Sequence, residues 1–195
     1  MALILPTTPE LTMFRPELVY ARNELVPEFG GPIQRRNRMG ARYRAQCRVA
    51  PQYYEDAMAW ADIDDETETC VLPILQPNID TSKIGNGLIN GSGIAGATLP
   101  VDGLFAHGFI RKNQWLSIVT DGQRYCYRVR ADLVADATGA ADIPLRTMMR
   151  VPHADGDLVE LVEPKIEGFV TVDPECWEPD EHQMINLSFT ITEIE

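Results

Sequence analysis

The clearest periodicity in this chain lies between residues 38 and 49, where apolar and polar side chains alternate. One parity carries Tyr43, Ala45, Cys47 and Val49, and the other carries Arg42, Arg44, Gln46 and Arg48. A period of two with one apolar face predicts a half-buried β-strand. Residues 185–191 repeat the pattern near the C-terminus, so we expect the two strands to pair antiparallel in one sheet.

A helical period follows this strand over residues 52–64. The residues that recur at helical spacing are Tyr53, Ala57, Trp60 and Ala61. Pro51 precedes them, and proline is tolerated in the first turn of a helix. We therefore expect the one long helix of the chain here, with these four side chains packed against a sheet.

Short strands and turns dominate residues 69–162. A strand is predicted over residues 69–75. It should lie at a sheet edge or end at Pro73 and Pro77, because proline cannot donate a hydrogen bond to a neighbouring strand. Asp121-Gly122 separates two further strand segments and is a strong hairpin signal. Six glycines from Ile84 to Gly103 predict a link whose backbone turns often or runs in loose extended form.

These elements combine into one mainly β fold with a single helix. Four or five short strands within about 60 residues fit a small barrel or sandwich. Because the strands before and after it are expected to pair, this barrel is inserted into a sheet domain. We expect residues 1–79 and 167–195 to form the sheet domain, and residues 80–166 to form the inserted barrel.

The charge balance argues against a general nucleic-acid binder. The chain has 195 residues and a net charge of −12, whereas phosphate contacts need a basic surface. Residues 91–96 match the dinucleotide pattern G-x-G-x-x-G. Pro100 prevents the helix that this pattern requires, so we expect no nucleotide and no other cofactor.

Residues that often carry catalysis show no suitable spacing. His107, His153 and His182 lie far apart, and none neighbours a nucleophilic Ser or Cys. Acidic clusters occur around Asp62 and Glu178, and nothing apolar flanks them to shift a carboxyl pKa. We predict that these clusters are solvated faces and that the chain is not an enzyme.

Cysteine spacing and the N-terminus bear on metal binding and location. The cysteines are Cys47, Cys70, Cys126 and Cys176. No C-x-x-C pattern or histidine at ligand spacing accompanies them, so we expect buried free thiols and no metal. The first residues lack the basic start and long apolar core of a secretory signal, so we expect the chain to stay where it is made.

Arginines concentrate in the N-terminal quarter of the chain. Residues 1–50 carry a net charge of +4 and residues 51–195 a net charge of −16. A row of guanidinium groups on one protein with an acidic remainder invites a head-to-tail contact between copies. The predicted contact residues are Arg36, Arg38, Arg42, Arg44 and Arg48. The alternative is a hydrated sheet face.

The order of segments resembles the distal tail proteins of long-tailed bacteriophages (siphoviruses) and related prophages. The resemblance spans nearly the whole chain and rests on the arrangement of its parts. These parts are the strand of residues 40–49, the Tyr-rich helix ending near Trp60, the link of residues 90–96, Trp115-Leu116-Ser117-Ile118, the turn of residues 136–139, and Ile143-Pro144-Leu145-Arg146.

This resemblance implies a β-sandwich ring domain that is interrupted by a small OB-like barrel facing outward. It also implies that six copies form a ring at the virion tail tip, after synthesis in the cytoplasm of the host bacterium. The ring would join the tail tube protein to the hub and adsorption apparatus, with tail fibre or tape measure proteins as further partners. DNA would pass through the lumen without specific binding, and no membrane insertion is implied.

Two other functions are kept as alternatives. A carbohydrate-binding module would use the barrel to recognise a cell-surface glycan, and rings and cations at residues 124–128 could stack on sugars or bases. Cross-strand packing is the other interpretation of those residues. A small hydrolase would use the acidic residues Asp62 and Asp64.

Overall fold

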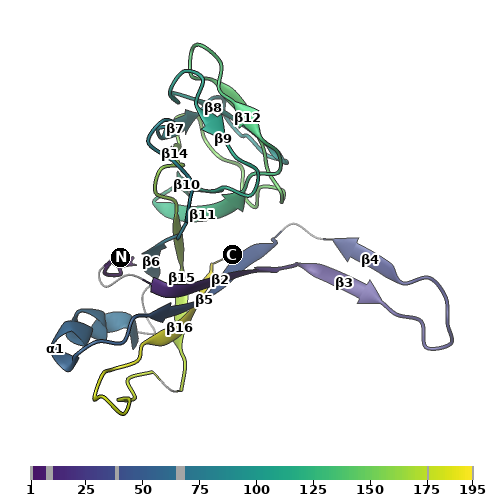
Figure 1. Ribbon diagram of the computed structural model, residues 1–195. Coiled ribbons are helices and arrows are strands. Elements are labelled where there is room, and N and C mark those ends of the chain that lie inside the picture. The colour runs from purple at the N-terminus through teal and green to yellow at the C-terminus, as the bar shows by residue number, and fades with distance from the viewer. Residues whose placement is uncertain (1, 8–10, 38–39, 65–68, 175, 195) are drawn as a thin grey trace.

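The computed structural model describes residues 2–7, 11–37, 40–64, 69–174 and 176–194. The chain is mainly β, as predicted, with 45% of its residues in strands and two main sheets. The first sheet has the strand order β1-β6-β15-β16-β5-β2 and the second has the order β11-β10-β14-β7-β8-β13. The second sheet stands above the first in Figure 1.

The first sheet is built from both ends of the chain. Its strands are β1 (Leu3–Ile4), β2 (Leu11–Val19), β5 (Arg42–Val49), β6 (Cys70–Pro73), β15 (Lys165–Val172) and β16 (Ser188–Glu193). The predicted pairing of β16 with β5 is confirmed, antiparallel, with Phe189 opposite Cys47. Of the two predictions for β6, the one that it ends at its proline is confirmed, because Pro73 is its last residue. The alternative of an edge position is wrong, because β1 pairs with β6 in parallel and covers that edge.

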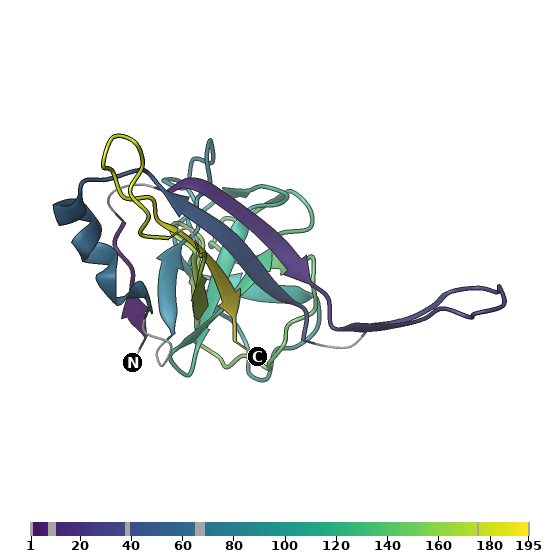
Figure 2. The same cartoon turned by 90° about the horizontal axis from the view of Figure 1, so that it is seen from below.

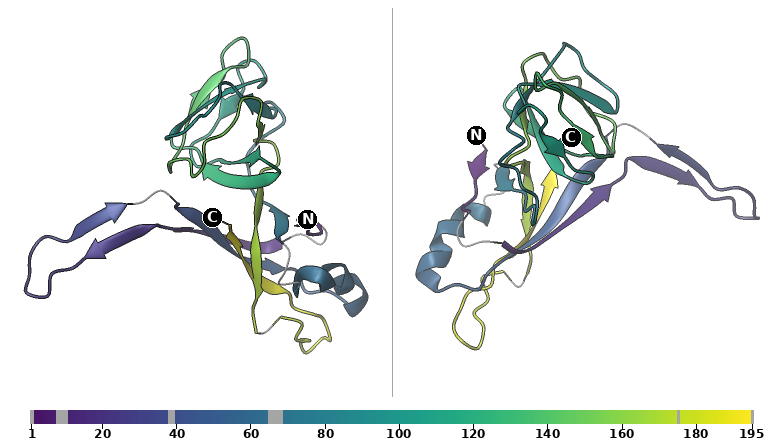
Figure 3. Two further views of the ribbon diagram at one scale, coloured as in Figure 1. Left: turned by 180° about the vertical axis from the view of Figure 1, so that it is seen from behind. Right: turned by 45° about the horizontal axis from the view of Figure 1, so that its top comes forward.

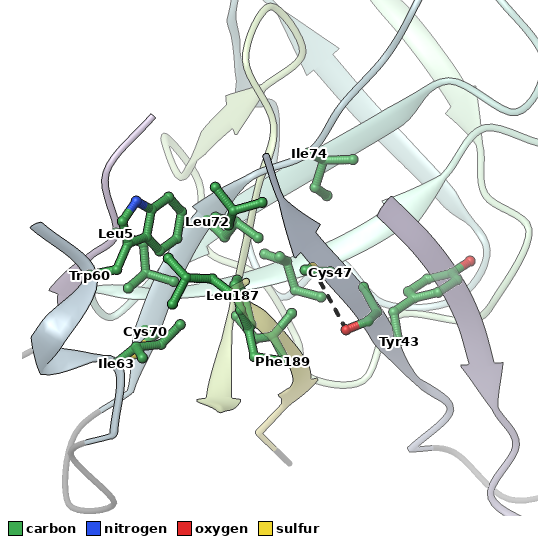
Figure 4. Close-up of a cluster of buried hydrophobic side chains, with 14 of the residues drawn as sticks. Leu5, Tyr43, Cys47, Trp60, Ile63, Cys70, Leu72, Ile74, Leu187 and Phe189 are labelled. Carbon is green, nitrogen blue, oxygen red and sulfur yellow. Dashed lines mark hydrogen bonds between the residues drawn. The ribbon is translucent and has the colours of Figure 1, made fainter. Parts of the chain in front are cut away.

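The alternation of β5 is confirmed. Tyr43, Ala45, Cys47 and Val49 are buried, and the residues between them face outward. The buried parity packs with Trp60, Leu72, Leu187 and Phe189 in one hydrophobic cluster on the inner face of the first sheet (Figure 4).

The predicted helix is short and changes type along its length. It begins as α1 (Tyr54–Ala57) and continues as a 3₁₀ helix, η1 (Met58–Asp64). Ala57 and Trp60 are buried as predicted, but Tyr53 and Ala61 are exposed. With about three residues per turn in the 3₁₀ segment, positions three apart share a face, and the residue that follows Trp60 in the core is therefore Ile63.

The second sheet comes from residues 87–160. Its strands are β7 (Gly87–Ile89), β8 (Thr98–Asp102), β10 (Trp115–Thr120), β11 (Gln123–Arg128), β13 (Ala141–Pro144) and β14 (Leu158–Glu160), and a small ladder joins β9 (Phe109–Ile110) to β12 (Leu133–Val134). The predicted hairpin at Asp121-Gly122 is confirmed, joining β10 to β11.

The two edge strands of the second sheet, β11 and β13, are joined just beyond their ends. An isolated bridge pairs Val129, after β11, with Leu145, after β13. Hydrogen bonds run from the Arg130 amide to the Pro144 carbonyl at 2.7 Å and from the Arg146 amide to the Arg128 carbonyl at 2.8 Å. No closed barrel is present among the described residues.

The glycine-rich segment turns often, as predicted, and the glycines with positive φ angles are Gly85, Gly91, Gly93, Gly96 and Gly103. It does not run in loose extended form, because it also supplies β7 and β8, which pair with each other. At Gly87 a Cβ atom would collide with the Val101 side chain and lie 2.8 Å from the Asp102 carbonyl oxygen. Glycine is required there because two strands approach closely, and not because the backbone must turn.

A buried ion pair joins the two sheets. Glu193, the last residue of β16, is almost fully buried, and its carboxylate lies 2.6 Å from the Arg150 guanidinium. The same carboxylate accepts hydrogen bonds from the backbone N–H groups of Tyr43 in β5 and Cys126 in β11. Burial raises the pKa of Glu193, although Arg150 and the two amides oppose that shift. One side chain therefore connects both sheets.

A second set of contacts reinforces this junction. Arg124 of β11 lies 3.2 Å from Glu160 of β14 and 3.8 Å from Glu167 of β15. Tyr43 and Trp115 meet edge to face, with their ring centroids 4.6 Å apart. The second sheet is thus held to the first by packing as well as by charge.

Replacing Arg150 with Met tests the junction. The change leaves the Glu193 carboxylate buried without its cation, so we expect the free energy of unfolding to fall by about 3–5 kcal/mol. The double variant Arg150→Met/Glu193→Gln should lose less, because no charge is left unpaired. Urea unfolding followed by circular dichroism measures both. Equal losses in the single and double variants would show that the buried charge is not the cause.

Candidate self-association surface

A two-stranded hairpin projects away from both sheets. It consists of β3 (Arg22–Leu25) and β4 (Gln34–Asn37), and we call residues 22–37 the arm. Figures 1 and 2 show the arm leaving the end of β2 and returning to the start of β5. Every side chain from Arg22 to Arg36 is exposed.

The Pro and Gly residues of the arm lie in the connection between its two strands. Pro27, Gly30, Gly31 and Pro32 lie between the two strands, and both glycines have positive φ angles, 82° and 140°. The Pro and Gly residues would interrupt a helix or a long strand, but here they form the connection of a hairpin. Tyr20 and Ala21 separate the end of β2 from the start of β3.

The arm carries large apolar side chains that no other described part of the chain covers. Phe29 is 99% exposed, and Leu25 and Val26 are each 66% exposed. Within the arm, Glu24 pairs with Arg22 at 3.1 Å and with Arg35 at 3.0 Å. An isolated hairpin is at best marginally stable in water, and a cluster of exposed apolar side chains marks an interaction surface.

The structure divides the predicted arginine row. Arg42, Arg44 and Arg48 lie on the outward parity of β5, while Arg36 lies in the arm on β4. Arg38 lies outside the described residues. Arg36 and the three arginines of β5 are therefore not one continuous row, because they lie on different strands, and Gly40 before β5 has a φ of 112°.

Part of the row has a partner within its own chain. Arg44 donates a hydrogen bond to Glu17 on the adjacent strand β2 at 2.7 Å. This hydrogen bond and the positive charge of Arg44 lower the pKa of Glu17. Both side chains are solvent-exposed, so the pair adds little to stability. The contact of this face with a second copy stays a prediction.

The structure brings together three residues that resemble a catalytic triad. Thr120 Oγ1 lies 2.6 Å from His153 Nδ1 and donates to Asp157 Oδ2, also at 2.6 Å. Tyr127 Oη lies 3.4 Å from His153 Nε2. Because the hydroxyl proton goes to the carboxylate, His153 Nδ1 must donate to Thr120 and cannot activate it as a base does.

This cluster is structural. His153 is fully buried, and burial lowers its pKa to about 4, with Asp157 opposing the shift. The imidazole is therefore neutral at pH 7 and bridges β10 to the loop before β14. A group of three or more His, Cys, Asp or Glu side chains able to hold a metal ion is absent from the described residues.

The tyrosine and arginine side chains of β11 pack against neighbouring residues of the chain. Tyr125 and Tyr127 are buried, Arg124 is held by Glu160, and Arg128 lies over the Trp115 ring at 4.7 Å. The prediction of cross-strand packing is confirmed, and these residues do not offer a stacking platform for bases or sugars.

The structure also places the cysteines, the G-x-G-x-x-G segment and the acidic residues that the sequence analysis considered. Cys47, Cys70 and Cys126 are buried, as predicted, whereas Cys176 is half-buried. Residues 91–96 precede the strand β8 and not a helix. Asp62 is exposed, whereas Asp65 and Glu66 lie outside the described residues. Among the described helices, none has the length and apolar character needed to cross a membrane.

The buried imidazole predicts a dependence of stability on pH. An unfolded chain binds a proton at His153 near the ordinary pKa of 6.5, whereas the folded chain does so only near pH 4. We expect the free energy of unfolding to fall as the pH drops from 6.5 to 4, by about 3 kcal/mol. The His153→Gln variant should show a shallower pH dependence in urea unfolding. Parallel profiles for the two proteins would contradict this assignment.

Comparison with known protein families found no family that matches this chain. A search of curated proteins also found no match.

Proposed function

We propose that this chain is a structural, non-enzymatic subunit of a phage tail tip that assembles into a ring of six copies. The ring joins the tail tube protein to the hub and the adsorption apparatus. The observation that carries the proposal is the arm, whose exposed Phe29, Leu25 and Val26 require a partner. The order of the sequence segments described above, which resembles that of the distal tail proteins of long-tailed bacteriophages, also supports the proposal.

The two sheets would have different roles in such a subunit. The first sheet, from which the arm extends, forms the ring domain, and its outward β5 face completes a sandwich-like interface with neighbouring protein. The second sheet, with its edges joined at Val129 and Leu145, would form the outer OB-like domain as a partly open barrel. The junction at Glu193 keeps the two in a fixed relation.

The charge of the chain supports a passage for DNA. Six copies with a net charge of −12 each would surround the lumen with negative potential and repel the phosphate backbone. DNA would slide through without binding to a sequence or to a basic groove. Tail fibre or tape measure proteins are further partners at the tail tip.

Glycan binding by the second sheet is the alternative function. Phe105 and Phe109 are exposed aromatic residues of this part of the chain, and Arg111 lies over the Phe109 ring at 5.7 Å. An aromatic ring with an adjacent cation can stack on a sugar, so this surface replaces the buried tyrosines as the place where a glycan would bind.

Imaging tests the ring directly. Negative-stain electron microscopy of the purified chain, with light scattering for its mass, should show hollow annular particles with six-fold symmetry. We expect assembly because an exposed arm on every copy favours association at high protein concentration. A chain that stays monomeric at every concentration and salt tested would overturn the proposal.

Calorimetric titration tests the alternative. If the second sheet binds glycan, host cell-surface polysaccharide should release or absorb heat with the wild-type chain, and the Phe105→Ala/Phe109→Ala variant should lose this signal. Annular particles with no heat of binding favour the ring function alone.

A further inference from the structure

We infer that the arm of one copy docks into an acidic, aromatic pocket at the opposite end of the first sheet of the next copy. This inference rests on the proposed ring and names the surface that closes it. We call this surface the acceptor pocket, and it is lined by Pro51, Gln52, Tyr53, Glu55, Asp56, Ala59 and Met184.

Chain connectivity places the arm and the acceptor pocket at opposite ends of β5. The arm returns to the sheet at Arg42, where β5 begins. The pocket starts at Pro51, just beyond Val49, where β5 ends and the chain turns into α1. All views agree that the arm and α1 extend from opposite sides of the molecule (Figures 1, 2 and 3). The arm of one copy therefore cannot fill its own pocket.

The charge of the acceptor pocket complements the arm. Residues 49–82 and residues 166–195 contain no lysine or arginine. Glu55 and Asp56 line the pocket and are exposed. The arm presents Arg22, Arg35 and Arg36, all exposed. It also carries Glu24, which pairs with Arg22 and Arg35, and Glu28, so the arm keeps a small excess of positive charge. Guanidinium and carboxylate groups pair through directional hydrogen bonds, which set the register of such a contact.

The apolar parts also match. Tyr53 in the pocket is 66% exposed, and Met184 lies beside it in the pocket lining. Phe29 at the tip of the arm is the most exposed large apolar side chain of the described residues. An aromatic ring against tyrosine and a thioether makes a favourable contact. Burying Phe29 there removes apolar surface of both copies from water.

Gln52 belongs to the pocket lining, but its side-chain amide is not offered to a partner. It is only 5% exposed, and each of its two amide atoms has less than 1 Å² of exposed surface. Its backbone is held by Ile185 through an isolated bridge. A docked arm would therefore contact the other residues of the lining.

Two interface variants and their mixture test the docking by multi-angle light scattering of the full chain. Phe29→Asp disables the arm, and Glu55→Arg/Asp56→Arg disables the pocket. Each should weaken association by about 30-fold or more, as expected for an interface hot spot. Mixed in equal amounts, the two should form a dimer and no larger species, because the one intact arm in each pair meets the one intact pocket.

Phe105→Asp is the matched control, because it places the same charge on an exposed phenylalanine of the second sheet. It should assemble like the wild type. Circular dichroism should show that every variant remains folded, since the changed side chains are exposed. Rings that survive both interface changes, or a mixture that yields no dimer, would overturn the docking. A wild-type chain that never forms rings would instead overturn the proposed function.

Discussion

The buried carboxylate of Glu193 is the interaction on which the arrangement of the two sheets depends. It ends the last strand of the first sheet and meets a guanidinium and two backbone amides from three other segments. Burial raises its pKa, and the guanidinium and the two amides oppose that shift by favouring the ionised form. Buried pairs of this kind add little net stability over apolar replacements. The effect of Glu193 is therefore mainly to orient the second sheet against the first.

The two proposed association surfaces, the arm and the acceptor pocket, both extend from the first sheet, so their relative placement does not depend on the second sheet. The amide of Tyr43 that binds Glu193 lies near the start of β5, next to the arm, and the acceptor pocket begins just beyond the end of β5. One strand thus sets the direction from the arm to the pocket. In a ring built from such contacts, the angle between successive copies follows from the twist of the first sheet.

The sequence predicted those elements whose burial follows a simple period. The alternation of β5 and of residues 185–191 places one parity in a core, and Asp121-Gly122 marks a hairpin. The arm was not predicted, because both of its strands are exposed on every side and show no period. Arg36 and Arg44 are close in the sequence, but only the turn at Gly40 shows that they lie on different elements. The Thr120–His153–Asp157 contact depends on tertiary pairing, which no local pattern reports.

In the proposed ring, closure follows from the way the two association surfaces are distributed. Each copy carries one arm and one acceptor pocket, so an open chain of copies would leave one exposed Phe29 and one empty acceptor pocket at its ends. Closing the ring would bury both without adding a new kind of contact. The cost of the exposed apolar surface at the free ends would therefore favour closure over further growth, provided that the angle between copies returns the last copy to the first.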